Sequence, residues 1–267
     1  MRCTWLVWLI AGCGFTGAPS VPTDDPGTGS GAGDPGAGSG SSTGSGSGTT
    51  GNTGSCDVTG ATLRLCVSFG QNPIDLLDPA HALIEATGIQ PIQGILNTVA
   101  GAFDGGSHLR FAESPDFDVQ DLTLEFWMAP SARPPKDKRN WIVDNNTQYF
   151  ATYEDDGSVR CGIGASTASS RTSVSTNSWH HVACTFSASA QQLRVYVDGN
   201  LSSCDSVNSI PQGGNDGVAI GANFGAGGYK ENYVGRLDAL HLYASALSAS
   251  DICSAANRSG CNAQCPD

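Results

Sequence analysis

Residues 177–183 read Asn-Ser-Trp-His-His-Val-Ala, and residues 193–199 read Leu-Arg-Val-Tyr-Val-Asp-Gly. Apolar and polar side chains alternate in both segments, which is typical of β-strands that bury one face. The second segment ends in Asp198-Gly199, and this pair favours a tight hairpin turn because glycine tolerates a positive φ. We therefore predict two strands here, the second of which runs into a hairpin.

Short segments with the same period of two follow one another along much of the chain, with Gly, Asp or Asn between them. In the segment 122–128 apolar side chains occupy the even positions. Glu125 therefore points to the opposite face, and this strand is predicted to be half-exposed. The predicted strands cover residues 63–69, 108–112, 122–128, 141–143, 148–153, 159–165, 180–186, 193–197, 218–221 and 236–243.

Two segments depart from this alternation. Residues 80–86 are predicted to form a short helix, which Pro91 prevents from continuing. Near the end, Ser248 and Asp251 have the spacing of a capping box, which predicts a short helix to about residue 257. About ten strands and one terminal helix predict an all-β fold, a two-sheet antiparallel jelly-roll sandwich with a short C-terminal helix.

Further motifs occur in a fixed order around these strands. They are Gly-Ala-Phe-Asp-Gly at 101–105, Leu-Thr-Leu-Glu-Phe-Trp at 122–127, Ile-Gly at 220–221 and Gly-Arg-Leu-Asp-Ala at 235–239. Together with the two opening segments they resemble the laminin-G-like jelly roll of the concanavalin A-like lectin and glucanase superfamily. The resemblance covers about residues 56–257 and implies ligand recognition on loops or on a concave sheet face. The long stretch 78–98 and the additional cysteines depart from the family pattern.

The first residues have the features of an export signal. Arg2 precedes an apolar run that is too short to cross a bilayer, which needs about 20 residues. The run ends in Leu-Ile-Ala-Gly-Cys at 9–13, which resembles the lipobox of bacterial lipoproteins. The resemblance implies a signal peptide at 1–12 and a lipidated Cys13, and the Gly14 that follows favours the outer membrane or the cell surface. An ordinary signal peptide cut near Ala18 stays open as the alternative.

Composition separates a linker from a folded part. Residues 13–55 are almost entirely Gly, Ser, Thr, Pro, Ala and Asp, so we expect a disordered linker there and a folded domain at 56–267. The chain has 13 Lys and Arg against 25 Asp and Glu, which gives a formal net charge of −12. Nucleic-acid binding needs clustered cations, so we expect no nucleic-acid partner. Membrane contact is expected through the lipid anchor only.

Cysteines indicate an oxidising compartment. An even number lies in the predicted folded part, which predicts four disulfides in an exported protein. A zinc site is the alternative, but it needs two close pairs of ligands, and the region supplies one near pair at its end. Proximity and strand order predict the pairs Cys56–Cys66 and Cys161–Cys184. No pairing is predicted for Cys204, Cys253, Cys261 and Cys265.

A structural calcium ion is the cofactor that the family resemblance implies, held between the N-terminal segment and the last long strand. Calcium prefers carboxylate and carbonyl oxygens. By resemblance Asp238 is the first candidate ligand, Asp75 the second and Asp104 the third. The alternative for Asp238 is a buried carboxylate that accepts backbone N–H bonds.

Two loops carry candidate ligand-binding side chains. The first, residues 223–233, places aromatic rings beside amides, which suits sugar stacking, although a glycine-rich turn over the sandwich edge explains it equally well. The second is a basic cluster around Arg133 and Lys136 in an acidic domain, which suits an anionic glycan, a lipid headgroup or a solvated hairpin tip. The candidates in the first loop are Phe224, Tyr229, Lys230, Asn232 and Tyr233.

Signatures of catalysis are missing from the sequence. Glycoside hydrolases need two carboxylates across the scissile bond, and no pair of acidic residues has the required spacing on one strand. A GxSxG pattern occurs at 40–44, inside the Gly/Ser-rich stretch, and none occurs in the predicted folded part. We therefore expect a non-catalytic, lipid-anchored surface module that binds carbohydrate or a glycoconjugate. A protein-binding adhesion or structural domain of the envelope and a glycoside hydrolase of the same superfamily stay open as alternatives.

Overall fold

The computed structural model describes residues 56, 62–70, 72–78, 80–95, 98–146, 148–214 and 216–266. The chain divides into two units, 1–47 and 48–267, and all of these residues belong to the second. The predicted signal peptide, Cys13 and the linker 13–55 lie outside the described residues. No described helix has the length and apolar character that a membrane span requires.

Strands dominate the described part of the chain. The 3-10 helix η2 (Pro115–Phe117) and the α-helix α1 (Ala249–Ala255) accompany them. The strands are β1 (Leu63–Ser68), β2 (Ile74–Asp75), β3 (Leu83–Thr87), β4 (Gln90–Gln93), β5 (Val99–Asp104), β6 (His108–Phe111), β7 (Leu122–Pro130), β8 (Arg139–Asn145), β9 (Tyr149–Glu154), β10 (Val159–Ile163), β11 (Ser166–Ser169), β12 (His180–Ser187), β13 (Gln192–Val197), β14 (Asn200–Ser206), β15 (Val218–Ile220), β16 (Asn223–Gly225), β17 (Gly228–Lys230) and β18 (Val234–Tyr243).

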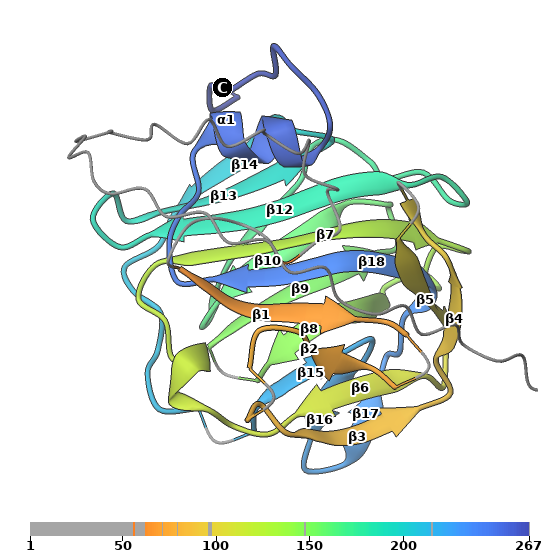
Figure 1. The fold of residues 1–267 in the computed structure, drawn as a ribbon. Helices are drawn as coiled ribbons and strands as arrows, with labels where there is room; N and C mark the ends of the chain where they lie inside the picture. Colours follow the sequence, from red (N-terminus) through yellow and green to blue (C-terminus); the bar gives the residue numbers. More distant parts are fainter. Residues whose placement is uncertain are drawn as a thin grey trace, which may run out of the picture. The chain divides into compact units, whose positions relative to one another are not determined.

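Within the described residues these strands form two stacked antiparallel sheets (Figure 1). The nine-stranded sheet has the order β14-β13-β12-β7-β18-β1-β2, with β5 added to β18 and β4 to β5. The seven-stranded sheet has the order β11-β10-β9-β8-β15-β6-β3, and β16 and β17 form a separate hairpin. The predicted sandwich with its short C-terminal helix is therefore confirmed.

The core lies between the two sheets and consists of alternate residues from each strand. Phe126 and Val182 come from the nine-stranded sheet, and Val143 and Ala151 come from the seven-stranded sheet; all four are buried in one apolar cluster. Truncating a large side chain in such a core costs roughly 2–5 kcal/mol. Burial of this cluster is what holds the sheets together.

Eight described cysteines form four disulfides. Cys161 in β10 is bonded to Cys184 in β12, so this bridge crosses the core from one sheet to the other. It and the Cys56–Cys66 bridge are the two pairs predicted from the sequence. The remaining bonds, Cys204–Cys265 and Cys253–Cys261, attach the C-terminal segment to β14 and to α1.

The segment predicted to be a helix at 80–86 is instead the strand β3, which starts at Leu83 and pairs with β6. Pro91 lies within β4, a strand that pairs with β5 alone. Proline is tolerated on such an edge because the missing N–H faces no partner. Local apolar spacing suggested a helix here, but pairing with neighbouring strands decided the conformation.

The outer face of the nine-stranded sheet is more buried than the alternation in β7 predicts. Helix α1 packs on it near β14, where Ile252 and Tyr196 share a small apolar cluster (Figure 1). Glu125 is only 6% exposed, which corrects the prediction of a half-exposed strand. Its Oε1 lies 3.7 Å from His181 Nε2 and 3.6 Å from His241 Nδ1, so imidazoles of the flanking strands pair with the carboxylate.

Candidate functional site

Alternate side chains of the seven-stranded sheet point away from the core, and aromatic rings lie among them. Phe150 in β9 is partly exposed, whereas its neighbours Tyr149 and Ala151 are buried in the core. Phe150 is directly opposite Gly162 in β10 and Asp144 in β8. An added Cβ at Gly162 would lie 2.0 Å from Cε1 of Phe150. The phenyl ring therefore occupies the space that a side chain at this position would fill.

Trp141 lies beside Phe150 on the same outer face. Their ring centroids are 5.0 Å apart with an interplanar angle of 48°, and both side chains are partly exposed. The indole Nε1 of Trp141 donates a hydrogen bond of 2.9 Å to Oε2 of Glu231. This hydrogen bond holds the indole of Trp141 in its orientation beside the phenyl ring. We call Trp141 and Phe150 the aromatic platform.

The hairpin β16–β17 extends this face with two more aromatic side chains. The guanidinium carbon of Arg110 lies 3.5 Å from the ring centroid of Phe224. Tyr229 stacks on His108 at 3.6 Å between centroids, and its hydroxyl donates a 2.7 Å hydrogen bond to Glu85. Burial, followed by the Glu85 carboxylate, raises the pKa of Tyr229 to about 12. These contacts attach the hairpin to β3 and β6.

A carboxylate lies between the hairpin and the platform. Asp144 is 2% exposed, and its Oδ2 accepts the N–H of Phe224 at 2.8 Å. Its Oδ1 is buried without a hydrogen-bond partner. Burial raises the pKa of Asp144 to about 6. The face therefore contains a buried polar group whose hydrogen-bonding capacity is only half used.

Charged side chains border the platform on its other side. Glu154 is buried and lies 3.3 Å from Arg160 Nη2 and 4.0 Å from Arg139 Nε. Thr152 donates a hydrogen bond of 2.6 Å to Oε1 of the same carboxylate. Both arginines are partly exposed, so they present N–H donors next to the aromatic rings. Aromatic rings with a few oriented polar groups are the usual lining of a small-molecule site.

The structure brings together some of the predicted loop residues. Phe224 and Tyr229 belong to this face, and Lys230 follows in β17 as an exposed side chain. Asn232 contributes its carbonyl oxygen, which accepts a 2.7 Å hydrogen bond from the side chain of Asn140. The aromatic residues Phe224 and Tyr229 anchor the hairpin and remain partly exposed, and a role for them in sugar stacking stays a prediction.

Tyr233 is a correction to the predicted site. It is fully buried and packs edge-on against Phe103 in the core, with ring centroids 6.1 Å apart. Its hydroxyl donates to the carbonyl oxygen of Arg236 at 3.3 Å. Successive side chains of an extended segment point to opposite sides. Asn232 is half-exposed on the outer side, so the next residue, Tyr233, points into the core.

The basic cluster lies in the connection between β7 and β8. Arg133 is exposed and donates a 3.1 Å hydrogen bond to Ser173, close to the turn at Gly157. Lys136 is exposed on the same connection. Arg133 thus contacts a serine rather than the aromatic platform, and a role for this cluster in binding stays a prediction.

The three predicted calcium ligands share no hydrogen-bond partner. Asp75 accepts the N–H groups of Cys66 and Leu77. Asp104 accepts the Gly106 N–H and the Ser107 hydroxyl. Asp238 is bonded to the Ile95 N–H at 2.9 Å and to the Thr98 hydroxyl, and burial raises its pKa. Among the described residues these three carboxylates do not form a group with ligand atoms within 4.8 Å of one another, and calcium binding at any one of them stays a prediction.

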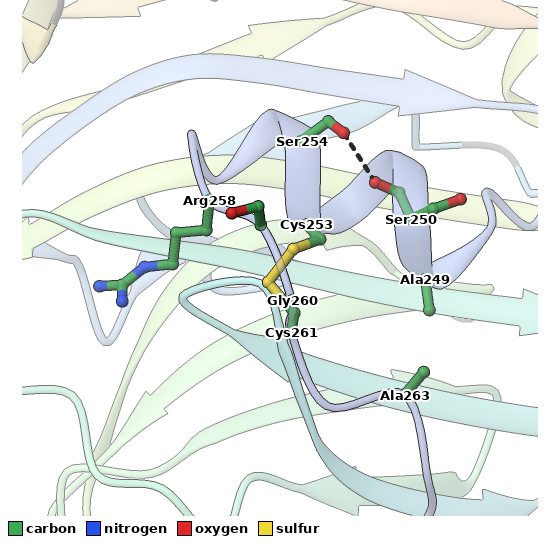
Figure 2. Close-up of a pocket in the computed structure, with 9 residues that line it drawn as sticks. Ala249, Ser250, Cys253, Ser254, Arg258, Gly260, Cys261 and Ala263 are labelled. Atoms are coloured by element: carbon green, nitrogen blue, oxygen red, sulfur yellow. Dashed lines mark hydrogen bonds between the residues drawn. A yellow bond between two sulfur atoms is a disulfide. The ribbon is translucent and has the colours of Figure 1, made fainter.

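A separate hollow of about 330 Å³ lies beside α1 (Figure 2). Its lining comes from α1 and the C-terminal segment, including the Cys253–Cys261 disulfide and the exposed Arg258. Ser254 donates a hydrogen bond to the carbonyl oxygen of Ser250 across one turn of the helix (Figure 2). The hollow contains no aromatic ring and no carboxylate among its lining residues, so the outer face of the seven-stranded sheet is the better candidate.

The residues predicted from the sequence as ligand-binding did not include Trp141, Phe150, Arg110 or Asp144. The strands of Arg110, Trp141 and Phe150 were predicted, but the predicted strand 141–143 ended before Asp144. Phe150 stands out as the aromatic residue between two inward positions. The missing information was the register, because only pairing shows that Phe150 faces a glycine and that Arg110 meets Phe224.

Two stacked antiparallel sheets with an aromatic outer face define a lectin-like jelly-roll domain. A family model described as the concanavalin A-like lectin/glucanases superfamily, Laminin_G_3, matches residues 103–253. The chain belongs to this superfamily. No curated protein sequence matches the chain.

Solved structures share the fold at low sequence identity. The binding domain of Paraclostridial Mosquitocidal Protein 1 is 18% identical with a TM-score of 0.59, over 73% of this chain and 52% of that one. Domain 4 of AbnA, a GH43 extracellular arabinanase from Geobacillus stearothermophilus, was solved with arabinotriose; it is 18% identical with a TM-score of 0.55, over 73% and 98%. The binding domain of botulinum neurotoxin serotype G is 11% identical with a TM-score of 0.56, over 73% and 50%. The chain thus spans about half the length of the toxin binding domains that it matches.

Proposed function

We propose that this chain is a non-catalytic carbohydrate-binding module and that the outer face of its seven-stranded sheet holds the glycan. The aromatic platform carries this proposal: two partly exposed rings lie 5.0 Å apart between centroids on a rigid sheet. Aromatic rings stack on the C–H faces of sugar rings, while neighbouring polar groups bond the hydroxyls. Arg139, Arg160 and Glu231 supply such groups beside Trp141.

The structural neighbours support the same class of function. Domain 4 of AbnA was solved in complex with arabinotriose, and the two toxin structures are binding domains. A short pentose or hexose oligomer is therefore a suitable first ligand to test. At the identities observed, these neighbours show a shared fold, and the ligand must be established on this chain.

We further propose that the domain works at the cell envelope. Four disulfides and a lectin-like fold indicate an exported protein. Lipidation at Cys13 and the linker 13–55 would then anchor the domain at the outer membrane or cell surface. Calcium bound at Asp238 remains part of this proposal, and intact mass and metal analysis of the purified protein test both features.

A protein-binding role is the second candidate, because large apolar side chains are exposed on the edge strands β2 and β3 and just after β2. Ile74 in β2 is 49% exposed, Leu76 is 51% exposed and Ile84 in β3 is 51% exposed. Exposed apolar residues of this kind mark protein-contact surfaces when they are contiguous. The adhesion hypothesis predicts that Leu76→Asp or Ile84→Asp abolishes partner binding.

The deciding experiment is a glycan-array screen of the full-length chain, with and without EDTA, followed by calorimetry on the best ligand. We expect Trp141→Ala and Phe150→Ala each to weaken binding by about tenfold, or ~1.4 kcal/mol. Trp179→Ala is the matched control, since this half-buried indole lies under Arg236 at 5.0 Å. Glycan binding that survives both platform substitutions would rule out this face.

A further inference from the structure

A second cluster of polar side chains lies away from the aromatic platform, between β2, β3 and η2. Ligand atoms of Asp78, His81 and Asp116 all lie within 4.8 Å of one another. Among the described residues, these three form a group of His, Cys, Asp or Glu side chains with ligand atoms this close together. Asp78 and His81 belong to the connection from β2 to β3, and Asp116 belongs to η2.

A buried carboxylate holds the imidazole of this cluster in place. Oδ2 of Asp75 lies 2.6 Å from Nδ1 of His81, and their side chains are 0% and 5% exposed. Oδ1 of Asp75 accepts the backbone N–H groups of Cys66 and Leu77, each at 3.0 Å. The carboxylate is therefore surrounded by donors, so Nδ1 of His81 is the atom that carries the proton. The ring also packs on Phe117, with centroids 4.7 Å apart.

The other ring nitrogen faces an acceptor. Nε2 of His81 lies 3.3 Å from Oδ2 of Asp116. In the tautomer with its proton on Nδ1, the lone pair of Nε2 lies on the Asp116 side of the ring and is available to a metal ion. The carboxylate of Asp78, whose Oδ1 accepts the Ala80 N–H at 2.7 Å, is the third anionic group nearby. A cation between these atoms would be within reach of all three side chains.

We propose that Asp78, His81 and Asp116 bind a first-row divalent metal ion such as Zn²⁺. Imidazole nitrogen suits zinc and its neighbours, whereas calcium and magnesium prefer oxygen ligands alone. Asp75 is a positioning residue that orients His81 through its Nδ1 proton, the arrangement that commonly supports metal-binding histidines. The Asp116 side chain is 51% exposed and is free to turn toward the ion. Water completes the coordination on the solvent side.

The proposal differs from the calcium prediction in both ligands and chemistry. Asp75 acts through His81 rather than on the ion, and neither Asp104 nor Asp238 takes part. Nε2 of His81 and Oδ2 of Asp116 are already 3.3 Å apart, and all three ligand atoms, which lie within 4.8 Å of one another, must come to about 3–3.5 Å, the spacing around a tetrahedral ion with bonds of about 2.0–2.2 Å. An exposed aspartate and a turn can make this adjustment without disturbing the core.

The test is calorimetric titration of the chelator-treated full-length chain with ZnCl₂. We expect one high-affinity site, which His81→Ala abolishes and Asp116→Asn weakens. Asp75→Asn keeps an acceptor for the backbone N–H groups, and we expect it to weaken Zn²⁺ by about 10–100-fold. His180→Ala and Asp205→Asn are matched controls from other strands and should leave the affinity unchanged.

Imidazole ¹⁵N NMR provides a readout that a change in stability would not move. Zn²⁺ binding should shift the Nε2 resonance of His81 and leave Nδ1 protonated. A His81 ring that is protonated on both nitrogens and does not respond to Zn²⁺ would overturn the proposal, because an imidazolium would then satisfy both carboxylates. Zn²⁺ affinity that is equal in wild-type and folded His81→Ala protein would overturn it as well.

Discussion

The phenyl ring of Phe150 in β9 lies over Gly162, the residue directly opposite it in β10. A Cβ at Gly162 would stand 2.0 Å from Cε1 and 2.1 Å from Cζ of the ring. Phe150 therefore keeps its place only because its cross-strand partner has no side chain. The position of one half of the aromatic platform depends on this pair.

Gly162→Ala should displace the Phe150 ring and weaken both the fold and the binding face. Overpacking of this kind typically costs 1–3 kcal/mol, and we expect about that loss in the free energy of unfolding. Urea unfolding and calorimetric titration of the glycan measure the two effects. Gly106→Ala is the control, since the nearest atom to its added Cβ is 3.5 Å away. Unchanged glycan affinity in Gly162→Ala would show that ring placement does not matter for binding.

Disulfides should differ in their contribution to stability according to the loops they close. Cys161–Cys184 spans 23 residues and Cys253–Cys261 spans 8. Loop-closure entropy predicts a loss of about 3.4 kcal/mol for the first pair and about 2.5 kcal/mol for the second when each is replaced by alanines. Guanidinium unfolding of the two double variants checks this order. A smaller loss for the pair that crosses the core would contradict it.

Glu125 should make folding sensitive to acid. Burial opposes its ionisation, but the flanking His181 and His241 outweigh burial and lower the pKa of Glu125 to about 2. Because the folded pKa is below the unfolded value of about 4.3, this stabilisation is complete above that value and is lost as the pH falls toward 2. Unfolding free energies measured from pH 6 to pH 2 should fall less steeply in Glu125→Gln than in the wild type. Parallel profiles would show that the three residues are not coupled.

Asp144 should make the folded state less stable as the pH rises, the opposite of the effect of Glu125. Burial raises its pKa to about 6, so the stability that it contributes is present below the unfolded value of about 3.9 and is lost as the pH rises through 6. Asp144→Asn keeps an acceptor for the Phe224 N–H without the buried charge. We expect this variant to be more stable than the wild type at pH 7.5 by about 1–3 kcal/mol and nearly equal at pH 4. Urea unfolding at both pH values measures the difference, and a variant less stable at pH 7.5 would contradict the prediction.

Much of the fold follows from alternation in the sequence. The segments around Val182 and Val195 were predicted as strands because apolar residues recur at every second position, and the capping box at Ser248 marked the start of α1. The segment near Leu83 was misassigned because it is short and its pattern suits a helix as well as a strand. Only its pairing with β6 distinguishes the two.

Fewer residues of the candidate site could be predicted from the sequence. Phe224 and Tyr229 could be found as aromatic residues in a glycine-rich loop, but Tyr233 from the same loop is buried in the core. Trp141 and Phe150 come from different strands, and no feature of either strand alone says that their rings meet.

The order of residues along the chain determined the class of fold, the number of cysteines available for bridges and the face on which most side chains lie. These are local properties, since period and turn chemistry act over a few neighbouring residues. Tertiary structure alone decided that Phe150 covers Gly162, that Glu125 is buried between two histidines and that His81 meets Asp116. Each of these contacts joins separate strands or loops, so it exists only once register and packing have brought them together.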